Sequence, residues 1–265
     1  MLGTQPPPVD GVNSFAAVQE RASAGTIGWT GPILLLGART VLLLVCQSSL
    51  ALVFYLCGKP SPLQAAGQWW VVYGTAVDAG CLIGLRFFLR REGLQLRNLL
   101  GPVRMRYGRD LWLGLGLYAL IFPFFLGASI AARLLIYGSD SAALTHYLFH
   151  AHRLPLWATI YSLAVWWVIW SPTEEATYQA YVMPRLRALT NRPWAAFVMV
   201  MFFFALQHSM LPFFPDWRYL LFRFVMFLPG CALLIAAYLR LRRLAPLIVA
   251  HWPMDISAAL MTLLW

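Results

Sequence analysis

Long apolar stretches separated by short polar connections make up most of the chain. Seven of these stretches are long enough to cross a bilayer as helices, at approximately 31–56, 69–89, 111–136, 156–184, 193–211, 219–239 and 244–264. A transmembrane helix needs about 20 predominantly apolar residues, and the short connections leave little room for separate domains. The pattern predicts an all-α protein in which residues 29–265 form one polytopic bundle of about seven to eight transmembrane helices.

The first 28 residues differ from the rest of the chain, because they are polar and rich in Pro, Gly, Ala and Ser. They lack the basic start and the short apolar core of a cleaved signal peptide. We therefore expect residues 1–28 to form a flexible cytoplasmic tail ahead of the membrane domain.

The composition excludes an ordinary soluble domain. Only 11% of the 265 residues are charged, 60% are hydrophobic and the mean hydropathy is +0.66. A soluble domain carries about 25% charged residues. The chain is therefore expected to be an integral, multi-pass membrane protein surrounded by the lipid bilayer.

The net charge of +10 follows from topology and does not indicate a nucleic-acid partner. Basic side chains gather in the connections after the second, fourth and sixth apolar stretches, and the alternate connections hold few. The basic connections contain Arg90, Arg91, Arg97, Arg104, Arg106, Arg109, Arg185, Arg187, Arg192, Arg240, Arg242 and Arg243. Because cytoplasmic loops carry an excess of Lys and Arg, we expect a cytoplasmic amino terminus and a location in the cell (plasma) membrane.

We assign no catalytic role to three further groups of polar residues. Asp78 can pair with Arg39 on a neighbouring helix, and we expect both to be structural. The arginine- and leucine-rich segment 89–110 fits either an amphipathic stretch in the cytoplasmic interface or a plain basic loop. His146 and His150 are four residues apart, as in a metal pair, but we expect them to be exposed loop histidines.

Two adjacent acids, Glu174 and Glu175, lie within the fourth apolar stretch. An ionised acid near the bilayer centre costs about 2.5–3.5 kcal/mol, and such residues usually mark function. Neighbouring side chains on a helix point about 100° apart, so the two acids face different surroundings. We expect Glu174 to face a reactant and Glu175 to support it, with Gln179 hydrogen-bonding Glu175 at four-residue spacing.

The fifth and seventh stretches each carry a pair of residues at four-residue spacing. Phe204 and His208 share one helical face, and so do His251 and Asp255. Counted from the arginine-rich boundaries at 1.5 Å per residue, Glu174, both histidines and Asp255 lie about 10 to 22 Å inside the membrane. We therefore expect these four residues to meet in one buried polar cavity.

This order of motifs resembles the CAAX protease and bacteriocin-processing (Abi-type) family of intramembrane proteases. The family pattern is E-E-x-x-x-R, then F-x-x-x-H, then H-x-x-x-N/D, on successive helices. Glu174-Glu175, Phe204…His208 and His251…Asp255 match it in order, and the resemblance covers roughly residues 155–262. One position departs from the pattern: the chain has Gln179 where the family has arginine, so an ion pair between Glu175 and arginine is absent.

The resemblance implies an endopeptidase that uses no metal or other cofactor and cleaves a membrane-anchored peptide or protein. By the same resemblance, Glu174 is the general base, and His208 orients and polarises the attacking water. His251 and Asp255 face the oxyanion; Asp255 donates a hydrogen bond there if protonated and otherwise orients His251. Glu175, Gln179 and Phe204 are supporting residues.

Three alternatives stay open at this point. Two acids, two histidines and a third acid are also a donor set for zinc, although the chain lacks H-E-x-x-H. Gln179 in place of arginine is compatible with a non-catalytic, protease-like membrane scaffold or regulator. Intramembrane Glu and His also serve in transporters and proton relays.

Overall fold

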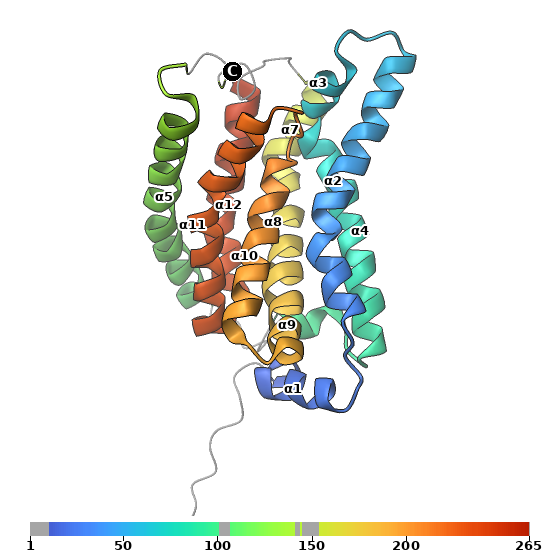
Figure 1. Ribbon diagram of the computed structural model, residues 1–265, viewed down its shortest axis with the longest axis vertical. Coiled ribbons are helices and arrows are strands. Elements are labelled where there is room, and N and C mark those ends of the chain that lie inside the picture. Colours follow the sequence, from blue (N-terminus) through green and yellow to red (C-terminus); the bar gives the residue numbers. More distant parts are fainter. Residues whose placement is uncertain (1–10, 101–106, 141–143, 145–153, 265) are drawn as a thin grey trace, which may run out of the picture.

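The apolar stretches form the long helices of the bundle in Figure 1, a computed structural model. It describes residues 11–100, 107–140, 144 and 154–264, apart from the side chains of 107 and 261–264, and within these ranges it contains helices and no strand. The principal helices are α2 (Thr30–Leu56), α4 (Trp70–Arg91), α5 (Tyr107–Tyr137), α8 (Trp167–Glu175), α9 (Met183–Thr190), α10 (Pro193–Ser209), α11 (Trp217–Leu241) and α12 (Ala245–Leu264). The shorter ones are η1 (Gly11–Asn13), α1 (Phe15–Ser23), α3 (Pro62–Gly67), η2 (Leu96–Leu99), α7 (Leu156–Tyr161), η3 (Ser162–Trp166) and η4 (Ala176–Val182).

Each predicted apolar stretch coincides with a long helix or with the consecutive run from α7 to α9. The predicted helical bundle is therefore confirmed. Among the described residues, four helices are long and apolar enough to cross a membrane: Thr30–Leu56, Trp70–Arg91, Gly108–Tyr137 and Trp217–Leu241. The total of seven to eight spans stays a prediction.

The outer faces of the long helices are apolar and exposed. Leu34 and Leu52 on α2 are 57% and 59% exposed, and Leu135 on α5 is 84% exposed. Apolar surface on this scale in a single chain marks contact with a membrane or a partner, and the helices that carry it have the length and hydropathy of membrane spans. The chain is an integral membrane protein.

The segment from Gly11 to Ser23 packs against the lower end of the bundle in Figure 1. Val18 is fully buried beside α9, and the buried Asn13 side chain donates a 2.9 Å hydrogen bond to the Ala180 carbonyl. This differs from the flexible tail expected for residues 1–28. The polar composition did not indicate this attachment, which combines the buried Val18 with polar contacts to distant residues, such as the hydrogen bond from Arg242 to the Asn13 carbonyl.

A buried ion pair closes the same end of the bundle. Arg185 donates two 2.7 Å hydrogen bonds to the carboxylate of Glu92, and both residues are buried. Leu94 and Leu99, which follow Glu92, belong to the hydrophobic core. The described part of segment 89–110 therefore folds under the bundle and is not a plain loop, and its position in the membrane interface stays a prediction; residues 101–106 lie outside the described ranges.

The helix that carries the two acids is irregular on both sides of them. It widens into π-helical turns at η3 and η4, before and after α8. Pro172 lies inside α8, two residues before Glu174, and proline has no N–H to donate to the preceding turn. Such π-turns occur frequently at functional sites, and here they bracket the predicted one.

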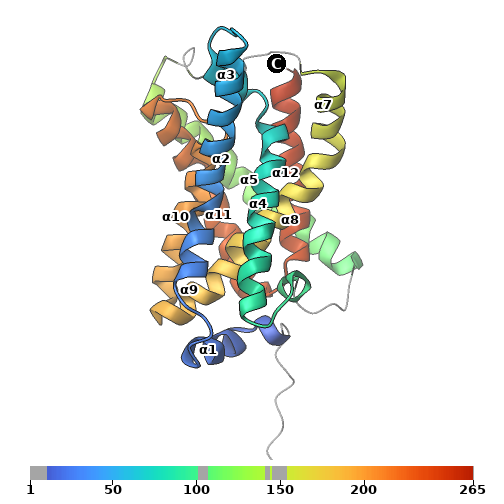
Figure 2. The same cartoon turned by 90° about the vertical axis from the view of Figure 1, so that its right-hand side faces the viewer.

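The arrangement of helices places the acids at the centre of the molecule. α8 packs against α4 and α12, and α10 packs between α2 and α11, while α5 covers α11 and α12 from outside. Figure 1 shows α8, α10 and α12 between α5 on one side and α2 and α4 on the other, and Figure 2 shows α10 on the opposite side of the bundle from α8 and α12. Polar residues on these three helices therefore face a shared interior.

Candidate active site

Glu174 lies between the two histidines of the predicted site. Glu174 is fully buried, and its Oε1 lies 3.5 Å from Nε2 of His208 on α10. Its Oε2 lies 3.8 Å from Nε2 of His251 on α12. Three helices far apart in sequence thus bring one carboxylate and two imidazoles together, as the depth estimate predicted.

Asp255 lies at the edge of the same cluster. Its Oδ1 is 3.7 Å from Nε2 of His251, which is longer than a hydrogen bond. Its Oδ2 accepts a hydrogen bond from the hydroxyl of Ser171 on α8. The carboxylate is therefore held by Ser171 and faces His251 without bonding to it.

Glu175 has a different partner from the one predicted. Its Oε1 lies 3.0 Å from Nδ1 of His251, so the acid reaches α12 and does not bond along its own helix. Gln179 is fully buried, and neither polar atom of its side chain has a hydrogen-bond partner among the described residues. The predicted bond between Glu175 and Gln179 is wrong, because a carboxylate gains more from an imidazole that can become cationic than from a neutral amide.

Aromatic rings fix the position of His208. Its imidazole stacks on the Phe227 ring of α11, with the centroids 3.8 Å apart and the planes at 6°. Phe204 lies 6.0 Å from His208 and 6.5 Å from His251, centroid to centroid, and it stacks on Tyr178. The predicted position of Phe204 beside the histidines agrees with the structure, and Phe227 adds a contact that the sequence did not indicate.

Gln207 is a neighbour of Glu174 that the motif search missed. Its Nε2 donates to Oε1 of Glu174, and its Oε1 accepts a 2.8 Å hydrogen bond from Nε of Arg39. Arg39 also forms the predicted ion pair with Asp78, at 2.8 Å, which is confirmed. The sequence did contain one indication that Gln207 belongs to the site. It is an amide directly before His208 in an otherwise apolar span.

Each of the three acids of the site has one hydrogen-bonded partner. Glu175 bonds to His251, Asp255 to Ser171 and Glu174 to Gln207. Within the described ranges, no three His, Cys, Asp or Glu side chains form a group suited to a metal ion. His146 and His150 lie outside those ranges.

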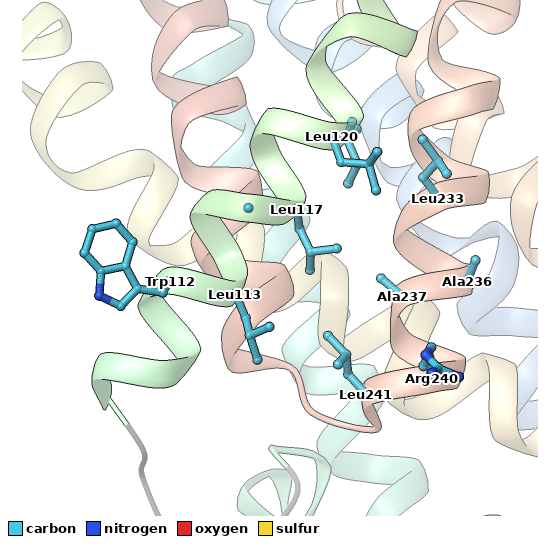
Figure 3. Close-up of a pocket in the computed structure, with 11 residues that line it drawn as sticks. Trp112, Leu113, Leu117, Leu120, Leu233, Ala236, Ala237, Arg240 and Leu241 are labelled. Carbon is cyan, nitrogen blue, oxygen red and sulfur yellow. The ribbon is translucent and has the colours of Figure 1, made fainter.

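A groove runs between α5 and α11 on the outside of the bundle (Figure 3). It has a volume of about 480 Å³ and apolar walls that include Leu117, Leu233, Ala236 and Ala237, with Arg240 at its lower end. Phe227 lies further along α11, roughly 9 Å beyond Leu233 at 1.5 Å per residue. Phe227, which stacks on His208, is not among the residues that line the groove.

Residues 155–257 match the family described as type II CAAX prenyl endopeptidase Rce1-like. No curated protein and no solved structure matches the chain. The matched segment runs from α7 into α12 and contains every member of the acid and histidine cluster, whereas α2, α4 and α5 lie outside it. The match confirms the resemblance to the CAAX protease and bacteriocin-processing family.

Proposed function

We propose that the protein is an intramembrane endopeptidase that hydrolyses a peptide bond in a membrane-anchored protein or peptide, using water activated by Glu174 and His208. The observation that carries the proposal is the buried Glu174 carboxylate, 3.5 Å from His208 and 3.8 Å from His251. An acid at this depth requires a role, and the segment that holds it matches a family of peptidases.

The two oxygens of Glu174 have different surroundings, which supports its role as general base. Oε1 accepts from Gln207, whereas Oε2 has no hydrogen-bond partner within the described part of the chain. In the proposed reaction, Oε2 takes a proton from water as the water oxygen attacks the carbonyl carbon. The proton then passes to the leaving amine when the tetrahedral intermediate collapses, so Glu174 ends as it began. His208 orients and polarises the water.

We assign His251 to the oxyanion. As an imidazolium both its nitrogens are donors: Nδ1–H donates to Glu175, 3.0 Å away, and Nε2–H faces the space shared with Glu174 and Asp255. A fixed donor aimed at the developing negative charge stabilises the transition state without reorganisation. Asp255, held by Ser171, keeps the ring facing that space.

The outer groove supports a lipid-anchored substrate. The matched family is described as a prenyl endopeptidase, and an apolar groove on the outside of the bundle suits a prenyl chain attached near the scissile bond. We propose that the chain enters between α5 and α11, that Arg240 contacts the polar end of the substrate, and that the peptide reaches the cluster past Phe227.

The orientation in the membrane follows from the basic residues at one end of the bundle. The ends of α4, α9 and α11 that carry Arg91, Arg187 and Arg240 lie at the same end as α1. Cytoplasmic surfaces carry such excess positive charge. We therefore propose that α1 lies in the cytoplasm and that the protein resides in the cell (plasma) membrane.

Filling the groove should weaken substrate binding without slowing the chemistry. We expect Ala236→Phe to raise KM about 10-fold, with kcat unchanged, because the added ring occupies the space of the apolar anchor. Leu135→Phe, at a lipid-exposed position of α5 outside the groove, is the matched control and should leave KM unchanged. An unchanged KM for Ala236→Phe would remove the groove from the substrate path.

A cleavage assay with purified protein tests the function itself. The protein in lipid nanodiscs is incubated with a farnesylated CAAX reporter peptide, and mass spectrometry identifies the products. We expect release of the carboxyl-terminal tripeptide, with full activity after exhaustive chelation. Activity that is lost on chelation and restored by zinc would indicate a metalloprotease and contradict glutamate chemistry. If neither the reporter nor other membrane-anchored peptides are cleaved, the result would favour the non-catalytic scaffold or regulator.

A further inference from the structure

A chain of polar side chains connects Glu174 to helices outside the family match. Arg39 on α2 and Asp78 on α4 are both fully buried, and they form an ion pair at 2.8 Å. Arg39 donates through Nε to Oε1 of Gln207, and Gln207 donates through Nε2 to Glu174. The amino-terminal half of the bundle therefore reaches the carboxylate through two hydrogen bonds.

The direction of this chain is fixed by the chemistry of arginine. A guanidinium has only donors, so the oxygen of Gln207 must face Arg39. The nitrogen of the same amide must then face Glu174. The reverse orientation would place donor against donor at Arg39 and oxygen against carboxylate at Glu174. Arg39 thus determines which end of the amide meets the acid.

Arg39 is itself held in place from two sides. Asp78 binds its Nη1, and its guanidinium carbon lies 4.1 Å from the centroid of the Trp170 ring. An arginine stacked on an indole in a desolvated site is attracted by the ring face. Trp170 lies one helical turn before Glu174 on α8, so the arginine is fixed relative to the helix that carries the acid.

We propose that Arg39 and Gln207 are positioning residues for Glu174: Gln207, oriented by Arg39, occupies Oε1 of the acid and leaves Oε2 to act as the base. The proposal rests on the endopeptidase function proposed above. It assigns the amino-terminal half a specific part in the reaction, through Gln207, and it predicts that loss of the amide donor slows the chemical step while substrate binding is retained.

Two buried glutamines provide a matched test. Gln207 and Gln179 are both fully buried, but only Gln207 bonds to the catalytic acid, and Gln179 has no hydrogen-bond partner among the described residues. Methionine has a similar length and no strong donor. We expect Gln207→Met to lower kcat about 10- to 100-fold, as removal of a group that orients a site residue typically does, with KM unchanged. Because Gln179 does not bond to Glu174, we expect Gln179→Met to lower kcat less than Gln207→Met does.

A third variant separates positioning from a purely structural role. Gln207→Asn retains an amide that can accept from Arg39 or donate to Glu174, on a side chain that is one methylene shorter. We expect its thermal stability to match that of Gln207→Met and its kcat to be higher. A kcat as low in Gln207→Asn as in Gln207→Met, or an equal loss in Gln179→Met, would overturn the proposal.

An independent measurement does not require activity. In protein labelled with ¹⁵N-glutamine, the side-chain NH₂ resonances of Gln207, assigned by their loss in Gln207→Met, should move in Glu174→Ala and in Arg39→Lys. The Gln179 resonances should not move. Unchanged Gln207 resonances would overturn the positioning role even in an active protease. Shifted resonances in a protein that cleaves nothing would support the orientation of Glu174 and reject the endopeptidase function.

Discussion

Replacing Glu174 by glutamine should abolish peptide hydrolysis while the protein stays folded and inserted. The amide oxygen still accepts from Gln207, so the local hydrogen bond is retained, but an amide cannot take a proton from water. General-base catalysis contributes about 10²- to 10⁴-fold, so cleavage of the reporter should fall by at least about 10²-fold. The initial rate of cleavage in nanodiscs measures the loss.

The neighbouring acid is the matched control for this experiment. Glu175 is equally buried, yet it reaches the reaction only through His251, so Glu175→Gln should retain more activity than Glu174→Gln. Thermal unfolding of both variants checks that neither loss comes from misfolding. Undiminished cleavage by Glu174→Gln would contradict the assignment of the base.

The sequence predicted the helices and the meeting of the four site residues because both depend on local or one-dimensional signals. Apolar length marks a membrane helix, and the cost of burying an acid marks Glu174. Helical rise then places His208 and Asp255 at comparable depth. These signals need no knowledge of which helices are neighbours.

Partners that lie far apart in the chain could not be predicted in the same way. The hydrogen bond between Arg39 and Gln207 joins residues 168 positions apart, and no spacing rule indicates it. The attachment of Asn13 to Ala180 spans 167 positions. Such contacts depend on which helices pack together, and that is decided by the whole bundle.

The structure also changes the significance of Gln179. The missing arginine was compatible with a non-catalytic scaffold, because Glu175 lacks the ion-pair partner of the family pattern. Glu175 instead bonds to His251, and a buried arginine, Arg39, reaches Glu174 from α2 through Gln207. The absence of arginine at position 179 is therefore no argument against an enzyme.

Replacing His251 by alanine should lower kcat about 10²- to 10³-fold. The variant loses the donor assigned to the oxyanion, and it also leaves Glu175 buried without its 3.0 Å partner. Because the oxyanion exists only in the transition state, the loss should appear in kcat with KM unchanged. Single-turnover cleavage of the reporter separates the two quantities.

Asp255→Asn is the control for that variant, because it changes a neighbour of His251 without removing a donor. The asparagine side chain still accepts from Ser171, as Asp255 does, and the two residues have nearly the same shape. Since Asp255 lies 3.7 Å from His251 and does not bond to it, we expect a smaller loss than in His251→Ala. An effect of His251→Ala confined to KM, or a loss no larger than that of Asp255→Asn, would contradict the assignment of the oxyanion donor to His251.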